Sequence, residues 1–228
     1  MGSMIKAFLF DADNTLYESK QAAKFADLAV MEHLSQICGI NKEELFEEWR
    51  ALVNEVKTSK DPKLRHRKYS YSILLKRHKI SKNVDEIYEI FLDEFLKNIR
   101  IFEGVKETLE ELKKRNFKLI IVSEDFKEQL EKKIKVLGLE KFFDFFVTCD
   151  DVGSMKPDRK YYEIVRSKLK IPFDEMVAVG DSFERDLEIP KILGMRCILV
   201  FGEDLRADFS INNFKEILNI LETLTFKQ

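Results

Sequence analysis

Two acidic residues, Asp11 and Asp13, directly follow the first apolar stretch of the chain, residues 5–10. A short apolar run that stops at a carboxylate is typical of a buried β-strand. In an open α/β sheet, ligands bind just beyond the carboxyl ends of the strands. One side chain could therefore reach a reacting atom while the backbone carbonyl of the other residue faces a cation. An Asp-x-Asp pair alone is weak support for catalysis, because acidic turns after strands are common.

Three later stretches add side chains of complementary chemistry. Ser123 ends one apolar run, Lys156 lies directly before a proline, and Asp181 follows another apolar run. Asp186 comes five residues after Asp181. A hydroxyl and an ammonium can donate hydrogen bonds to an anionic group, and a pair of carboxylates can bind a hard cation. In chain order, the sequence thus offers a nucleophile, a second carboxylate, a hydroxyl, an ammonium and an acidic pair.

This order of residues resembles the four motifs of the haloacid dehalogenase superfamily of phosphohydrolases, and the resemblance covers essentially the whole chain. It implies that Asp11 attacks phosphorus and forms an aspartyl phosphate. Asp13 would protonate the leaving oxygen and then activate water on the acyl phosphate. Ser123 would donate to a phosphoryl oxygen, and Lys156 would neutralise charge on the phosphoryl group and on Asp11.

A cation is expected at the same site, because Asp11 and a phosphoryl dianion repel each other. A hard cation that takes oxygen ligands and retains waters is Mg²⁺. By the resemblance, its ligands are the carboxylates of Asp11 and Asp181 and the backbone carbonyl of Asp13. We expect Asp186 to be an outer or water-mediated partner of the metal. Pro190 lies inside the helix expected over residues 186–193 and should shorten or kink it.

One position departs from the family pattern. After the motif serine many members carry Asn or Gly, whereas this chain has Glu124 and Asp125. The added negative charge disfavours anionic leaving groups unless these side chains point away, and the sequence leaves both orientations open. Asp13 argues against the dehalogenase branch, which is similar in fold but does not carry a second Asp for this proton transfer.

The elements that must position these residues follow an alternating pattern. Apolar runs predict five strands, at residues 5–10, 118–122, 145–148, 176–179 and 197–201. Helical periodicity lies between them, which predicts an α/β fold with a doubly wound parallel sheet, a Rossmann-type core. Residues 18–99 show helical spacing only, and the resemblance identifies them as an inserted α-helical cap. The catalytic core then comprises residues 4–17 and 100–228.

A basic run, residues 63–68, is expected on the third of four cap helices. One arginine, Arg65 or Arg67, or one tyrosine, Tyr69 or Tyr71, could touch the substrate. The alternative, a solvated basic face, is the favoured interpretation for most of these side chains.

The composition gives no support for several classes of partner. Among 228 residues, 39 Lys+Arg nearly balance 41 Asp+Glu, which gives no reason to expect nucleic acid or an acidic membrane. Three widely spaced cysteines fit neither a disulfide framework nor a zinc cluster and suggest a reducing cytoplasm. No apolar run reaches the length of a membrane span, and no signal peptide is visible. The oligomeric state stays open.

We therefore expect a cytoplasmic, Mg²⁺-dependent phosphatase that acts on a small phosphomonoester. The nearest alternative is a phosphomutase that uses the same aspartyl phosphate with a bisphosphate activator. A phospho-accepting signalling receiver needs only about half this length and no helical insert. A binding protein that has lost catalysis is disfavoured, because no motif residue is missing.

Overall fold

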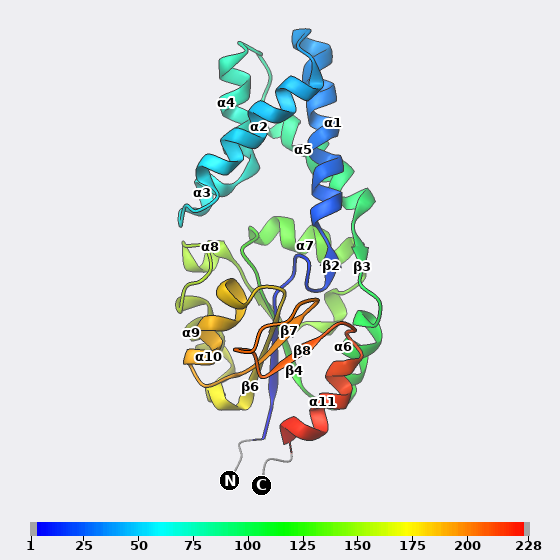
Figure 1. Cartoon of the computed structure of the whole chain (residues 1–228), viewed down its shortest axis with the longest axis vertical. Coiled ribbons are helices and arrows are strands. Elements are labelled where there is room, and N and C mark those ends of the chain that lie inside the picture. Colours follow the sequence, from blue (N-terminus) through cyan, green and yellow to red (C-terminus); the bar gives the residue numbers. More distant parts are fainter. Residues whose placement is uncertain (1–3, 226–228) are drawn as a thin grey trace. The chain divides into compact units, whose positions relative to one another are not determined.

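The structure, a computed structural model, describes residues 4–225 (Figure 1). The chain forms two compact units. One is the helical segment Ser19–Ile99, and the other, the core unit, combines the described residues up to Glu18 with those from Arg100 onward.

The core unit contains a parallel sheet of six strands in the order β5-β4-β1-β6-β7-β8. The strands are β1 (Ala7–Phe10), β4 (Lys118–Val122), β5 (Phe145–Val147), β6 (Met176–Gly180), β7 (Arg196–Val200) and β8 (Phe209–Ile211). Strand β1 lies between β4 and β6, and all four of its residues are buried. A strand covered on both faces can be apolar throughout, as this one is. The predicted doubly wound α/β sheet is confirmed.

Helices cover both faces of this sheet. They are α6 (Val105–Lys114), α7 (Lys127–Val136), α8 (Cys149–Val152), α9 (Lys160–Leu169), α10 (Glu188–Ile192) and α11 (Glu216–Thr225), with short 3₁₀ turns at Glu140–Phe142 and Phe173–Glu175. In Figure 1, α9 and α10 lie on one side of the strands, and α6 and α11 lie on the other. This arrangement buries the sheet between two helical layers.

The alternation of side chains along β1 divides its packing between the two layers. Phe8 and Phe10 point to one face. There the centroid of the Phe8 ring lies 5.2 Å from that of Phe117, and the centroid of the Phe10 ring lies 5.9 Å from that of Phe214. Leu9 points to the other face and joins a buried cluster with Tyr161 of α9. Both faces therefore hold β1 in place and fix where its carboxyl end lies.

Parallel strands bring the residues that follow them to one edge of the sheet. Phe10 pairs in register with Ile121 of β4 and with Val179 of β6. The Asp11 N–H continues this pairing by donating to the Val179 carbonyl at 2.9 Å, and the Ser123 N–H donates to Val147 at 3.0 Å. Asp11 and Ser123 thus remain anchored to the sheet just past its last regular pairs.

A second, two-stranded sheet was not predicted. Strands β2 (Tyr17–Glu18) and β3 (Arg100–Ile101) pair antiparallel, with Tyr17 opposite Ile101. Each strand has two residues, which is too short to show an alternating pattern in the sequence. The pairing lies where the chain leaves the core unit and where it returns.

The helical unit consists of α1 (Lys20–Cys38), α2 (Lys42–Val56), α3 (Pro62–Arg65), α4 (Arg67–Arg77) and α5 (Val84–Asn98). The prediction of a single third helix was wrong. His66 has an extended backbone that ends α3, and its ring Nδ1 accepts the Lys68 N–H at 3.1 Å as the cap of α4. A side-chain cap at this point stabilises a new helix start, so the basic run is divided between two helices.

No helix within residues 4–225 is long and apolar enough to cross a lipid bilayer.

Candidate active site

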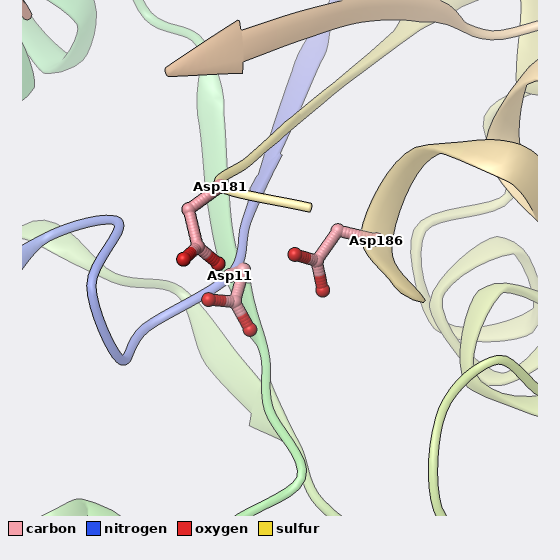
Figure 2. A group of neighbouring side chains, drawn as sticks. All are labelled: Asp11, Asp181 and Asp186. Atoms are coloured by element: carbon pink, nitrogen blue, oxygen red, sulfur yellow. The ribbon is translucent and has the colours of Figure 1, made fainter. Parts of the chain in front are cut away.

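Three carboxylates converge at the carboxyl edge of the sheet (Figure 2). Asp11 follows β1, Asp181 follows β6, and Asp186 lies in a π-helical turn, Phe183–Leu187. One carboxylate oxygen from each lies within 4.8 Å of the others. Hard cations such as Mg²⁺ prefer oxygen ligands of this kind. The donor set therefore fits a divalent cation, and Asp186 belongs to it as closely as the two predicted carboxylate ligands.

The close approach of Gly180 and a hydrogen bond from Tyr162 fix the position of Asp186. A side chain at Gly180 would place its Cβ 2.4 Å from the Asp186 Cβ, so only glycine permits this approach. Pro190 has no N–H to donate to the carbonyl four residues earlier, which is that of Asp186. The Tyr162 hydroxyl donates to this carbonyl instead, at 2.9 Å. The proline thus helps to explain both the irregular turn and the buried tyrosine hydroxyl.

Lys156 is a buried side chain that bridges two of the carboxylates. Its side chain is only 2% exposed, and its Nζ donates to Asp11 Oδ1 at 2.8 Å and to Asp186 Oδ1 at 2.9 Å. Burial opposes the charged form, but the charges of Asp11 and Asp186 hold the pKa of Lys156 well above its usual value. Lys156 is therefore an ammonium held against the predicted nucleophile.

Both oxygens of Asp11 have donors, because the Thr15 hydroxyl donates to Oδ2 at 3.0 Å while Lys156 binds Oδ1. Burial raises the pKa of Asp11 to about 6; the charge of Asp186 adds to the rise and Lys156 opposes it. The carboxylate is thus oriented on both sides, in a setting where its charge is destabilised unless a cation is near.

Asp13 lies in a separate cluster. Lys133 Nζ donates to both Asp13 carboxylate oxygens at 3.1 Å and to Asp125 Oδ2 at 2.8 Å. The Asp13 carboxylate is not in the group of three described above. The prediction that Asp13 binds the metal through its backbone carbonyl stays a prediction.

Sequence reasoning missed Lys133, because α7 contains several lysines. The signal that could have found it is its place on the apolar face of that helix. Leu130 and Ile134 are fully buried, and Lys133 lies between them at helical spacing. A cation on a buried face needs a carboxylate partner, and none of the four motifs accounts for this one.

The structure also shows how the two acidic residues after Ser123 point. Asp125 turns toward Asp13 and Lys133, and burial together with the Asp13 charge raises its pKa to about 7. Glu124 pairs with Arg185 instead. Asp125 thus shares one buried lysine with Asp13.

Ser123 is buried beside these groups, and its Oγ accepts the Asp125 N–H at 3.1 Å. A hydroxyl that accepts a hydrogen bond still has its own proton to donate. This geometry is compatible with the predicted contact to a phosphoryl oxygen.

In the helical unit, Arg67 and Tyr71 are engaged with a buried carboxylate. Arg67 donates to both oxygens of Asp27, at 3.1 and 3.3 Å, and the Tyr71 hydroxyl donates to Asp27 at 2.6 Å. The guanidinium also lies over the Phe91 ring, 4.2 Å from its centroid. These contacts favour a stabilising role for Arg67 over substrate contact. The prediction for Arg65 stays a prediction.

Comparison with known proteins gives a consistent picture. The family model described as haloacid dehalogenase-like hydrolase matches residues 5–194. Glyceraldehyde 3-phosphate phosphatase from Methanocaldococcus jannaschii is 25% identical over 97% of this chain and 99% of the relative. The match therefore extends through both units of the chain.

Two solved structures are similar over nearly their whole length. A HAD phosphatase from Thermococcus onnurineus is 27% identical, with a TM-score of 0.76 over 95% of this chain and 98% of that one. A 2-haloacid dehalogenase from Pseudomonas syringae is 26% identical, with a TM-score of 0.76 over 96% and 99%. Because the family model spans most of the sequence and the four motifs meet at one sheet edge, the chain belongs to the haloacid dehalogenase-like hydrolases.

Proposed function

We propose that this hydrolase is a Mg²⁺-dependent phosphatase that cleaves a small phosphomonoester through an aspartyl phosphate on Asp11. The observation that carries this proposal is that the two motif aspartates have different cationic partners. Asp11 is paired with Lys156 inside the acidic group, whereas Asp13 is paired with Lys133 outside it. Two carboxylates in different surroundings can take the roles of nucleophile and proton carrier.

The reaction proposed for these residues has two steps. A carboxylate oxygen of Asp11 attacks phosphorus while Asp13 gives its proton to the departing ester oxygen, which leaves as an alcohol. Asp13, now ionised, takes a proton from water, whose oxygen attacks the phosphorus of the acyl phosphate. Inorganic phosphate leaves, and Asp11 is regenerated. Lys156 and Ser123 would hold the phosphoryl oxygens through both steps.

The metal would be held by Asp11, Asp181 and the Asp13 carbonyl, with Asp186 as an added or outer partner. These residues fit it because they supply only oxygen donors at one edge of the sheet. When bound, the metal supplies charge neutralisation between the dianionic substrate and the carboxylates.

The substrate proposal draws on the relatives. Glyceraldehyde 3-phosphate is the first compound to test, because the phosphatase named for it matches along both chains. Dehalogenation is the second candidate, since one of the similar structures carries that name. Asp13 favours hydrolysis of a phosphate ester, because a dehalogenase has no leaving oxygen to protonate. We further propose that residues 18–99 act as a cap that selects substrates.

The test is a panel of phosphorylated metabolites, assayed for phosphate release with Mg²⁺ and with excess chelator. A panel of 2-haloacids, assayed for halide, runs in parallel. We expect phosphate release that chelation abolishes and Mg²⁺ restores, and no halide release. Full activity in chelator would contradict the metal dependence, and halide without phosphate would replace a phosphatase by a dehalogenase.

A further inference from the structure

Lys133 is a buried cation that the proposed reaction does not use. Its side chain is 9% exposed, and it lies on the apolar face of α7. Removing an ammonium from water is costly unless carboxylates or other acceptors surround it. The charge of such a residue has either a stabilising or a functional role.

Two of the three contacts that the ammonium makes with carboxylate oxygens restrain Asp13. An ammonium has three N–H donors, and three carboxylate oxygens lie 2.8–3.1 Å from Lys133 Nζ. Two of these oxygens belong to Asp13, at equal distances, so neither rotation nor displacement of that carboxylate leaves both contacts intact. The Asp13 side chain nevertheless keeps 30% exposure. It is therefore restrained while it remains accessible.

The cluster links three separate segments of the core unit. Asp13 and Tyr17 lie in the chain after β1, Asp125 lies in the loop after β4, and Lys133 comes from α7. The Tyr17 ring, which is fully buried, has its centroid 5.8 Å from the ammonium. Asp125 accepts the third N–H of the Lys133 ammonium and so restrains Lys133. The added negative charge after the motif serine thus has a structural partner.

We propose that Lys133 is a positioning residue that holds the Asp13 carboxylate in place for its two proton transfers, with Asp125 anchoring Lys133. A general acid or base must lie within about 2.6–3.2 Å of the proton that it moves. A displacement of about 1 Å can reduce the rate on the order of 10²-fold. Lys133 can have this role only if the proposed aspartyl-phosphate reaction is right, and its loss should then slow the steps that need Asp13.

Rapid-quench kinetics of Lys133→Met with p-nitrophenyl phosphate test the proposal. The p-nitrophenolate leaving group hardly needs a proton, so the burst that forms the phospho-enzyme should remain. We expect turnover after the burst to fall about 10–100-fold, because water activation needs a positioned base. With an alkyl phosphate, whose leaving group does need a proton, the burst should slow as well. Lys133→Arg, which keeps charge and donors, should recover part of the turnover.

The matched control is Lys132→Met, one residue earlier on the same helix. Lys132 is 39% exposed and pairs with Glu128 one turn away, so its loss should change turnover less than twofold. A double-mutant cycle with Asp13→Asn then identifies the route of action. Residues that act through one another are not additive. Once Asp13 is gone, we expect Lys133→Met to change turnover by less than about threefold.

The outcomes separate this inference from the proposed function. Absence of any phospho-enzyme in the wild-type protein would reject the reaction itself. With a normal wild-type burst, equal slowing of burst and turnover with p-nitrophenyl phosphate would reject positioning through Asp13. A full additional loss in the Asp13→Asn background would reject it as well. If Lys133→Met does not fold, the cycle is run with Lys133→Met combined with Asp125→Asn, which removes both charges. Failure of both variants to fold would make Lys133 a stabilising residue and overturn the proposal.

Discussion

The two units of the chain bury charge in different proportions. In the helical unit, one guanidinium, Arg67, meets one carboxylate, Asp27, with a tyrosine hydroxyl completing the set. In the core unit, one ammonium, Lys156, lies in a group with three carboxylates. The first cluster is balanced, whereas the second has an excess of negative charge. Removal of one partner from a balanced buried cluster leaves an uncompensated charge, whereas a cluster with excess negative charge favours the uptake of a cation or a proton.

The Lys133 cluster lies between these two cases. Its single ammonium meets two carboxylates, Asp13 and Asp125, which leaves one excess negative charge among the three groups. One of these carboxylates is partly exposed and the other is anchored. Substitutions in the balanced and the unbalanced clusters should therefore separate stability from activity.

The largest effect is expected from Asp11→Asn. It removes the proposed nucleophile, so turnover should fall on the order of 10⁴-fold or more, with no phosphate recovered on the protein. Because it also removes one of several neighbouring negative charges, the metal-free protein should unfold at an equal or higher temperature. Turnover of p-nitrophenyl phosphate, mass analysis of quenched enzyme and thermal melts measure these three results. Phosphate bound at another residue, or clear destabilisation, would contradict the assignment.

Asp27→Asn in the balanced cluster should have the opposite pattern. It leaves Arg67 without its counter-charge, and breaking a buried pair in this way costs about 3 kcal/mol. Urea unfolding should show the loss, while the folded protein keeps its turnover of a small ester. Glu32→Gln on the same helix is the control, because Glu32 is 48% exposed in its pair with Lys42. Its effect on the free energy of unfolding should be much smaller than that of Asp27→Asn, because an exposed ion pair contributes little. If Asp27→Asn and Glu32→Gln reduced the free energy of unfolding equally, the balanced cluster would have no special role in stability.

What the sequence predicts well are the residues tied to strand ends. Asp11, Ser123 and Asp181 follow apolar runs, and parallel strands bring such positions together whatever the details of packing. The sequence could not predict the partners of Asp13 and Asp27. Lys133 is 120 residues from Asp13, and Arg67 is 40 residues from Asp27. Pairings at this separation depend on how helices pack, which local patterns do not determine.

Short elements were also beyond prediction. Two-residue strands, such as β2, are too short for periodicity to reveal. The interruption at His66 depends on a histidine ring acting as a helix cap, which residue preferences alone do not favour. The orientation of Asp125 likewise depends on Lys133, because neighbouring positions in a loop can point to either side.

The smallest expected effect is the pH dependence of the unbalanced cluster. Asp11 has its pKa raised from 3.8 to about 6 in the folded, metal-free protein, first by burial and then by the charge of Asp186. A carboxyl whose pKa is higher in the folded state adds stability when protonated. That contribution is complete below about pH 4 and disappears as the pH rises through about 6. Between about pH 7 and pH 5, Asp11 alone should therefore stabilise the metal-free protein by about 1 kcal/mol.

Bound Mg²⁺ should reverse this trend, because the metal and the proton compete for the same carboxylate. The rise in unfolding temperature on adding Mg²⁺ should be large at about pH 8 and should shrink as the pH falls below about 6. Thermal melts across this pH range measure the unfolding temperature both in Mg²⁺ and in excess chelator. In chelator, the unfolding temperature of Asp11→Asn should depend less on pH than that of the wild type. Asp27→Asn, in the balanced cluster, should keep the wild-type pH dependence. A Mg²⁺ effect that is the same at every pH would mean that the cation does not bind to the Asp11 carboxylate.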